Sequence, residues 1–117
     1  MNRREEGTRG EGLVAAYLEQ KGYRIRTTNY LCKTGEIDIV AELGQTLVFV
    51  EVKLRRSLQY GRPAEAVTPQ KLQRIERTAQ WYLTAHRLHD REARIDVAEV
   101  FRGPGGVRIT HLENVTG

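Results

Sequence analysis

The sequence predicts an α/β fold in which helices flank a mixed β-sheet, with the elements in the order α-β-β-β-α-β-β. Two segments carry apolar residues at helical spacing, and five segments alternate or run apolar in the manner of strands. One helix falls between the third and fourth strands, and a crossover of that kind joins parallel strands. With 117 residues the chain has room for one hydrophobic core, so residues 1–117 are expected to form a single domain.

The first helix is expected to begin at Thr8, because Thr8 and Glu11 have the spacing of a capping box. Apolar residues recur behind them at helical spacing, and the helix should run to Lys21. Gly22 follows as a natural left-handed stop. The alternating stretch Tyr23–Thr27 then predicts the first strand.

A β-hairpin is predicted from the strands Glu36–Glu42 and Leu47–Leu54, joined by a two-residue turn that starts at Gly44. The turn determines the register of the hairpin. In this register Asp38 lies directly opposite Glu51.

Both faces of the hairpin carry apolar residues, which indicates that other elements cover it on both sides. The first face should place Glu36 opposite Lys53, beside the two facing acids. The second face is expected to be wholly uncharged and to consist of Ile37, Ile39, Ala41, Val48, Val50 and Val52.

A second helix should follow Thr68, an N-cap residue, with Pro69 at the first helical position. Trp81 is expected in the core, beside a buried helical stripe made of Leu72, Ile75, Ala79, Tyr82 and Leu83. Residues 94–101 and 107–115 complete the sheet as two further strands, joined by a turn rich in glycine.

Asp38 and Glu51 are the centre of the predicted chemistry. Opposed carboxylates about 5 Å apart repel by roughly 3 kcal/mol at an effective dielectric near 20. A divalent cation would turn this repulsion into attraction, and oxygen ligands suit Mg²⁺ or Mn²⁺ better than Zn²⁺. Lys53, on the same face, could orient an attacking water or stabilise a phosphoryl transition state. The alternative is a strand pair decorated with salt bridges, such as one between Glu36 and Lys53.

The positive charge of the chain is concentrated in one segment. Residues 51–77 hold seven Lys or Arg and three Glu, while the rest of the chain holds twelve basic and twelve acidic residues. Such a distribution is typical of a polyanion-binding face, although a solvated helix and a flexible loop would also explain it. The candidate nucleic-acid contacts are Arg55, Arg56, Tyr60, Arg62, Lys71 and Arg74.

The stretches Gly35–Ala41 and Val48–Arg55 resemble the signature of the PD-(D/E)XK nuclease superfamily. Within it, the chain is most similar to the YraN-like family of small bacterial proteins, which is related to archaeal Holliday junction resolvases. The likeness covers nearly the whole chain and includes Gly10-Glu11-Gly12, Ala66-Val67-Thr68, Lys71, Arg94-Ile95-Asp96-Val97 and residues 109–114. It departs from the superfamily pattern at Ile37, where a proline often stands.

The resemblance implies a restriction endonuclease-like fold with metal bound by Asp38 and Glu51 and completed by the Val52 carbonyl. It also implies catalysis by Lys53 and a place in the site for Glu11, a role that competes with helix capping. Asp96, an acid within an apolar strand, is expected either to support the site or to make a structural hydrogen bond.

These features favour a nuclease that uses Mg²⁺ or Mn²⁺ to hydrolyse DNA, with branched and single-stranded DNA as candidate substrates and RNA less favoured. The alternatives are a nucleic-acid-binding adaptor that cleaves little and a structural partner of a DNA-processing complex. No apolar run is long enough to span a membrane, and the charged first residues do not form a secretory signal, so the expected compartment is the cytoplasm. The likeness to junction resolvases suggests a homodimer.

Overall fold

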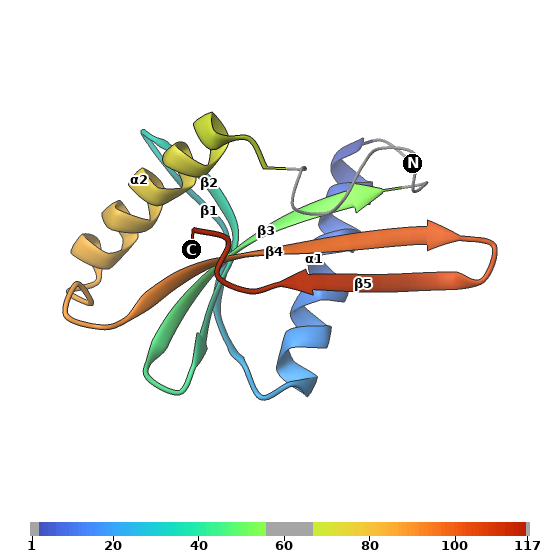
Figure 1. Ribbon diagram of the computed structural model, residues 1–117, viewed down its shortest axis with the longest axis horizontal. Helices are drawn as coiled ribbons and strands as arrows, with labels where there is room; N and C mark the ends of the chain where they lie inside the picture. The colour runs from blue at the N-terminus through green and yellow to red at the C-terminus, as the bar shows by residue number, and fades with distance from the viewer. Residues whose placement is uncertain (1–2, 56–66, 117) are drawn as a thin grey trace.

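A computed structural model describes residues 3–55 and 67–116, and the side chains from Arg9 onward within those ranges. It contains two helices and five strands in the predicted order (Figure 1). The elements are α1 (Arg3–Gln20), β1 (Arg24–Cys32), β2 (Gly35–Leu43), β3 (Thr46–Arg55), α2 (Pro69–Ala85), β4 (Ala93–Gly103) and β5 (Gly106–Leu112). The predicted α/β class is confirmed.

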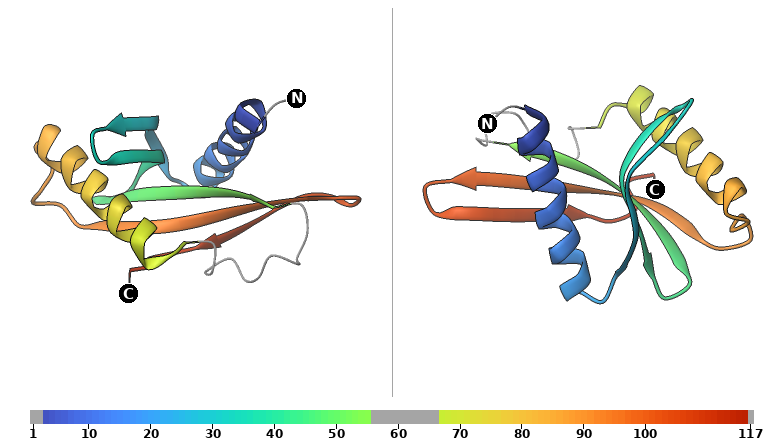
Figure 2. Two further views of the ribbon diagram at one scale, coloured as in Figure 1. Left: turned by 90° about the horizontal axis from the view of Figure 1, so that it is seen from above. Right: turned by 180° about the vertical axis from the view of Figure 1, so that it is seen from behind.

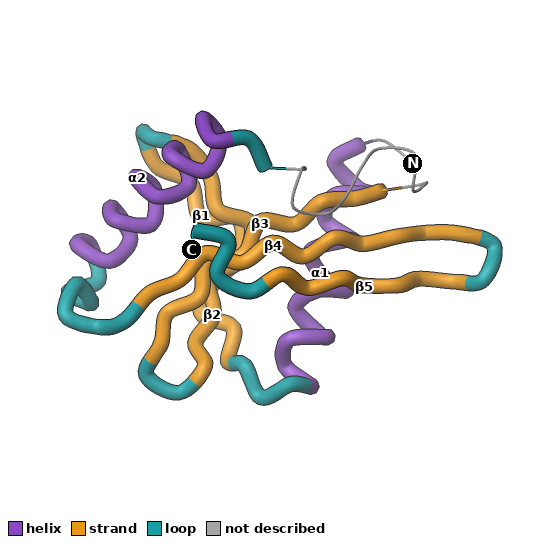
Figure 3. Tube along the Cα trace, viewed as in Figure 1, coloured by secondary structure: helices purple, strands orange, loops and turns teal. Residues whose placement is uncertain are grey.

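The five strands form one sheet in the order β1-β2-β3-β4-β5. The neighbours β3 and β4 are parallel and joined through α2, whereas the other three pairs are antiparallel. The two helices lie on opposite faces of the sheet, α2 in front of it and α1 behind it in Figure 1, and in reverse in the right view of Figure 2. The β4–β5 hairpin extends past both helices at one end, as Figure 3 shows.

Each helix packs on its own apolar core. Successive residues of β3 point alternately into the two cores. Val48 and Val50 pack with Val14 and Leu18 beneath α1, whereas Phe49 packs beneath α2. The α2 core also includes Val40, Leu47, Ile75, Ala79, Tyr82, Leu83 and Ile95. The hairpin is therefore covered on both sides, as its sequence predicts.

Helix α1 begins at Arg3, not at Thr8. The residues before Thr8 are mostly Arg and Glu, which are good helix formers. The predicted capping box is wrong because Thr8 lies within the helix. Glu11 is consequently free of a capping role.

Helix α2 begins as predicted: Pro69 occupies the first turn and the Thr68 hydroxyl accepts a hydrogen bond from the Lys71 amide at 3.1 Å. The predicted place of Trp81 is wrong, since half of its surface is exposed. Each residue turns an α-helix by about 100°, so Trp81 is rotated out of the stripe that buries Tyr82. No helix in residues 3–55 and 67–116 has the length and apolar character of a membrane span.

Candidate metal centre and nucleic-acid interface

Strand β2 leaves β3 at Asp38. Their ladder has the predicted register as far as the pair Ile39–Val50 and ends one pair short of Asp38 and Glu51. Beyond that point the Val52 amide donates a hydrogen bond to Asp38 Oδ2 at 2.8 Å. The Asp38 carboxylate thus accepts the hydrogen bond that a main-chain carbonyl would accept in a regular ladder. The sequence predicted that Asp38 and Glu51 lie directly opposite each other; instead, the two strands diverge at this point and form a fork.

The same position interrupts the pairing of β2 with β1. That ladder passes from Thr28–Ile39 to Tyr30–Ile37, and the residue of β1 at the gap, Asn29, has a φ of 53°. Asparagine is one of the few residues that accept this left-handed conformation readily.

The interruption shifts the alternation of side chains in β2 by one residue. Ile37 packs in the core beneath α2, whereas Ile39 packs in the core beneath α1. The prediction that both isoleucines share one face is therefore wrong. Because the strand loses its regular alternation at Asp38, this acid lies at the margin of the sheet, where β2 diverges from β3.

Three carboxylates converge at the fork. Glu11 from α1 meets Glu36 and Asp38 from β2, and one oxygen of each lies within 4.8 Å of the others. Glu11 therefore lies where the family resemblance places it. Glu36 was expected only as a salt-bridge partner of Lys53, although its spacing of two residues from Asp38 could have indicated a shared site.

The pKa values of Asp38 and Glu11 show how poorly the charges of these two acids are compensated. Burial is the main effect that raises the pKa of Asp38 to about 7, and the negative charge of Glu51 is the second. The hydrogen bond from the Val52 amide acts in the opposite direction but is outweighed. Burial also raises the pKa of Glu11, although a hydrogen bond from Asn29 opposes the rise. A group of carboxylate oxygens that holds protons so readily fits a hard divalent cation such as Mg²⁺ or Mn²⁺.

Glu51 has two lysine neighbours instead. Its Oε1 lies 3.0 Å from the Nζ of Lys71 and 3.8 Å from the Nζ of Lys53. Burial and the neighbouring Lys71 lower the pKa of Lys53. Burial acts against the charge of Lys71 too, but hydrogen bonds to Lys53 and Glu51 outweigh it and raise its pKa. Lys53 thus pairs with Glu51, not with Glu36 as the alternative interpretation expected, and is the lysine that loses its proton more easily.

The predicted nucleic-acid contacts divide into three groups. Arg56, Tyr60 and Arg62 lie outside the described residues. Arg55 directs its Nε toward Oε2 of the buried Glu99, at 3.3 Å, so this nitrogen faces the sheet. The remaining two are on α2, where Lys71 meets the carboxylate of Glu51 and Arg74 is exposed beside Gly35.

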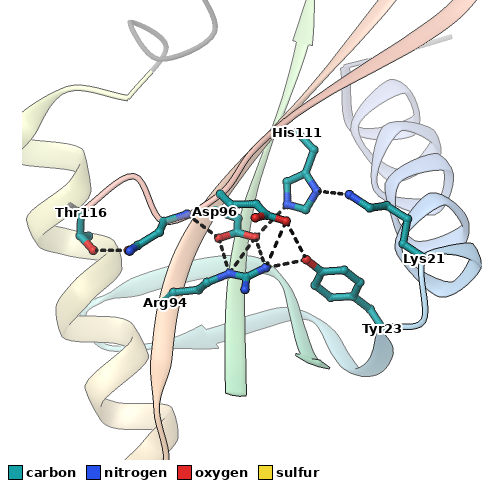
Figure 4. Close-up of polar contacts among 8 residues, drawn as sticks. Lys21, Tyr23, Arg94, Asp96, His111 and Thr116 are labelled. Atoms are coloured by element: carbon teal, nitrogen blue, oxygen red, sulfur yellow. Dashed lines mark hydrogen bonds and ion pairs between the residues drawn. The ribbon is translucent and has the colours of Figure 1, made fainter. Parts of the chain in front are cut away.

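Asp96 lies on β4, within the group of polar contacts that Figure 4 shows. It is fully buried and bonds to Arg94 Nε at 3.0 Å, to His111 Nε2 at 2.8 Å and to the Asn114 amide at 2.9 Å. These contacts tie the segment after β5 to β4. Of the two roles predicted for Asp96, the structure shows the hydrogen-bonded structural one.

A five-stranded mixed sheet with one parallel pair and a helix on each face is the architecture of a restriction endonuclease-like fold. The chain belongs to the uncharacterised protein family UPF0102, the YraN-like family of the PD-(D/E)XK-like nucleases, whose family model matches residues 10–100. It is 52% identical to a UPF0102 protein of Syntrophus aciditrophicus over 108 residues, which cover 92% of this chain and 85% of the relative. A UPF0102 protein of Beutenbergia cavernae is 47% identical over 110 residues, 93% of either chain.

Proposed function

We propose that this protein is a nuclease that depends on Mg²⁺ or Mn²⁺ and hydrolyses phosphodiester bonds in DNA. The observation that supports this most strongly is the convergence of Glu11, Glu36 and Asp38 beside Glu51 and its two lysines. Carboxylates from two separate elements meet there at a distortion of the sheet, and strained, poorly compensated groups cluster at functional sites.

The residues that would hold the cation are Asp38 and Glu51, with the Val52 carbonyl completing the set and Glu11 and Glu36 adding oxygens. Their chemistry fits, because all of these donors are oxygens and one oxygen of each of the three acids at the fork lies within 4.8 Å of the others. When bound, the cation would lower the pKa of a coordinated water and neutralise charge on the phosphate.

Lys53 has the position and the pKa of a group that handles the attacking water. It lies within 3.8 Å of Glu51 and its pKa is lowered, so it can exchange a proton nearer neutral pH than an exposed lysine. Lys71 stays protonated and can move from Glu51 to a phosphate oxygen of the substrate.

DNA is the substrate that the charge pattern supports. Lys71 and Arg74 lie on the first turns of α2, within a segment that holds all the net positive charge of the chain. Counterion release on contact with phosphates would make binding strongly dependent on salt. We further propose that the protein works in the cytoplasm as a homodimer, as the likeness to junction resolvases suggests.

A second candidate is an adaptor that binds DNA without cleaving it. The ion pair of Lys71 with Glu51 favours this possibility, because it compensates the Glu51 charge without a metal. An adaptor has no chemical need for the three acids at the fork, so we rank it second.

A cleavage panel separates the two candidates. Single-stranded, duplex, flap and four-way DNA would each be incubated with Mg²⁺ or Mn²⁺, beside Asp38→Ala protein as the control. The nuclease proposal expects at least one substrate to be cut by the wild type and left intact by the variant. A wild type that binds these substrates and cuts none of them would favour the adaptor.

A further inference from the structure

Trp81 is the only tryptophan of the chain, and half of its surface is exposed on the outer side of α2. Large aromatic side chains bury 150–250 Å² each and are enriched where proteins make contacts. Helix α2 begins beside the reaction centre, which consists of Glu11, Glu36, Asp38, Glu51 and Lys53, because its Lys71 contacts Glu51. An indole exposed on this helix is therefore a candidate contact residue.

Trp81 lines an open concavity of about 430 Å³. Its other lining residues are polar: Thr34, Arg77, Gln80 and Thr84. Thr34 belongs to the β1–β2 turn, and its hydroxyl bonds to the Thr78 hydroxyl of α2 at 2.9 Å, which holds the turn against the helix. The concavity thus offers one aromatic face, one guanidinium and several hydrogen-bonding groups, which are the groups that recognise a nucleobase.

Basic residues connect this concavity with the reaction centre. Lys71, Arg74 and Arg77 follow one another every third residue along α2, so that they and Trp81 share one side of the helix. Arg74 and Arg77 are both exposed, and within residues 3–55 and 67–116 neither forms an ion pair. The row extends over about 15 Å from Lys71 to Trp81 at 1.5 Å per residue.

The second wall of the concavity leads to the same centre. Thr34 precedes Glu36 by two residues and Asp38 by four, or about 13 Å of strand at 3.3 Å per residue. Stacked nucleotides rise by about 3.4 Å each, so some four nucleotides would connect the two places.

We propose that Trp81 and Arg77 form a stacking site for an unpaired base of DNA, whose strand follows Arg74 and Lys71 to the reaction centre. The inference rests on the proposed function and narrows its substrate to DNA with a single-stranded portion. The row of positive charge complements a phosphate backbone. A protein partner fits less well, because a stable protein interface needs roughly 1,000 Å² or more and the residues that lead from the indole along α2, Arg77 and Arg74, are charged and exposed.

Because Trp81 is the only tryptophan, its fluorescence reports on this site alone. The wild type would be titrated with a dodecamer of thymidylate and with an abasic dodecamer of equal charge, in Ca²⁺ to prevent turnover. Stacking predicts that the thymidylate strand quenches the emission strongly and that the abasic strand quenches it little.

Fluorescence anisotropy of labelled oligonucleotide would then compare variants. Trp81→Ala should weaken thymidylate binding about fivefold or more and leave abasic binding unchanged, while Trp81→Phe should retain most of the affinity. Val107→Ala, a truncation at a similarly exposed apolar residue of β5, is the matched control.

Thymidylate binding with unchanged Trp81 emission, or equal affinity of Trp81→Ala, would overturn the stacking site while leaving the proposed function intact. If Trp81→Ala converts a dimer into a monomer and retains its DNA affinity, Trp81 is a contact between two copies of the chain, and the stacking site is overturned. If neither oligonucleotide nor any panel substrate binds, the DNA proposal itself fails, and the stacking site fails with it.

Discussion

The Val52 amide donates to Asp38 Oδ2 at 2.8 Å, at the point where β2 leaves β3. This bond holds one carboxylate oxygen of Asp38 at the fork, next to Glu11 and Glu36. A single side chain therefore both ends the β2–β3 ladder and brings together the candidate metal ligands.

Asp38→Asn should make the metal-free protein more stable at pH 8 and alter its pH dependence. The folded state raises the pKa of Asp38 to about 7, so the folded protein binds a proton more tightly than the unfolded chain does. The wild type should then lose stability on the order of 2–4 kcal/mol as the pH rises from about 4 to 7. Urea unfolding in EDTA at pH 5 and pH 8 tests this, and equal pH dependence of wild type and variant would contradict it.

Mn²⁺ should bind at the fork, and Glu51→Gln should largely abolish that binding. The substitution removes one negative charge and one ligand oxygen at nearly constant volume. Isothermal titration calorimetry measures both proteins, with Glu113→Gln as a control because Glu113 is an exposed acid after β5. Equal affinity of wild type and Glu51→Gln would remove Glu51 from the metal site.

Lys71→Met should bind Mn²⁺ about three- to tenfold more tightly than the wild type, because the ammonium that occupies Glu51 is absent. DNA binding in Ca²⁺ should weaken, since Lys71 is then the group expected to contact phosphate. Arg77→Met removes the same charge six residues further along α2 and should leave Mn²⁺ affinity nearly unchanged. Weaker Mn²⁺ binding by Lys71→Met would show that the lysine helps to build the metal site.

Asp96→Asn should cost about 3–5 kcal/mol at pH 7, because it leaves Arg94 without its buried partner. Burial alone would raise the pKa of Asp96, but hydrogen bonds from His111, Arg94 and the Asn114 amide outweigh it and lower this pKa. The stabilisation is therefore present above the unfolded pKa near 4 and is lost as the pH falls below it. Denaturant unfolding at pH 7 and thermal melts between pH 3 and 5 measure both effects, and a variant as stable as the wild type would contradict them.

The order of the elements and most of the hairpin follow from local signals. Gly44 has a φ of 61° in the turn, as the predicted register requires, and Thr68 with Pro69 starts α2 where expected. Local chemistry determines each of these features, so the sequence is sufficient to predict them.

The fork could not be predicted, because it depends on contacts between distant residues. A regular hairpin keeps Ile37 and Ile39 on one face, and only the bond from Val52 to Asp38, with the left-handed Asn29 opposite, shifts the alternation. The exposure of Trp81 was missed for a different reason: Tyr82 and Leu83 already fill the space beneath α2.

We propose that Lys53 and the acids at the fork together carry out metal-dependent hydrolysis, and Lys53→Met tests this claim most directly. Single-turnover cleavage of the best panel substrate in Mn²⁺ would be measured for wild type and variant, together with DNA affinity and melting temperature. If Lys53 acts in the transition state, Lys53→Met should cleave more slowly than the wild type by orders of magnitude, while its DNA affinity stays nearly unchanged. Unchanged cleavage with a loss of about 1 kcal/mol or less in stability would contradict the claim and reduce Lys53 to a salt-bridge partner of Glu51.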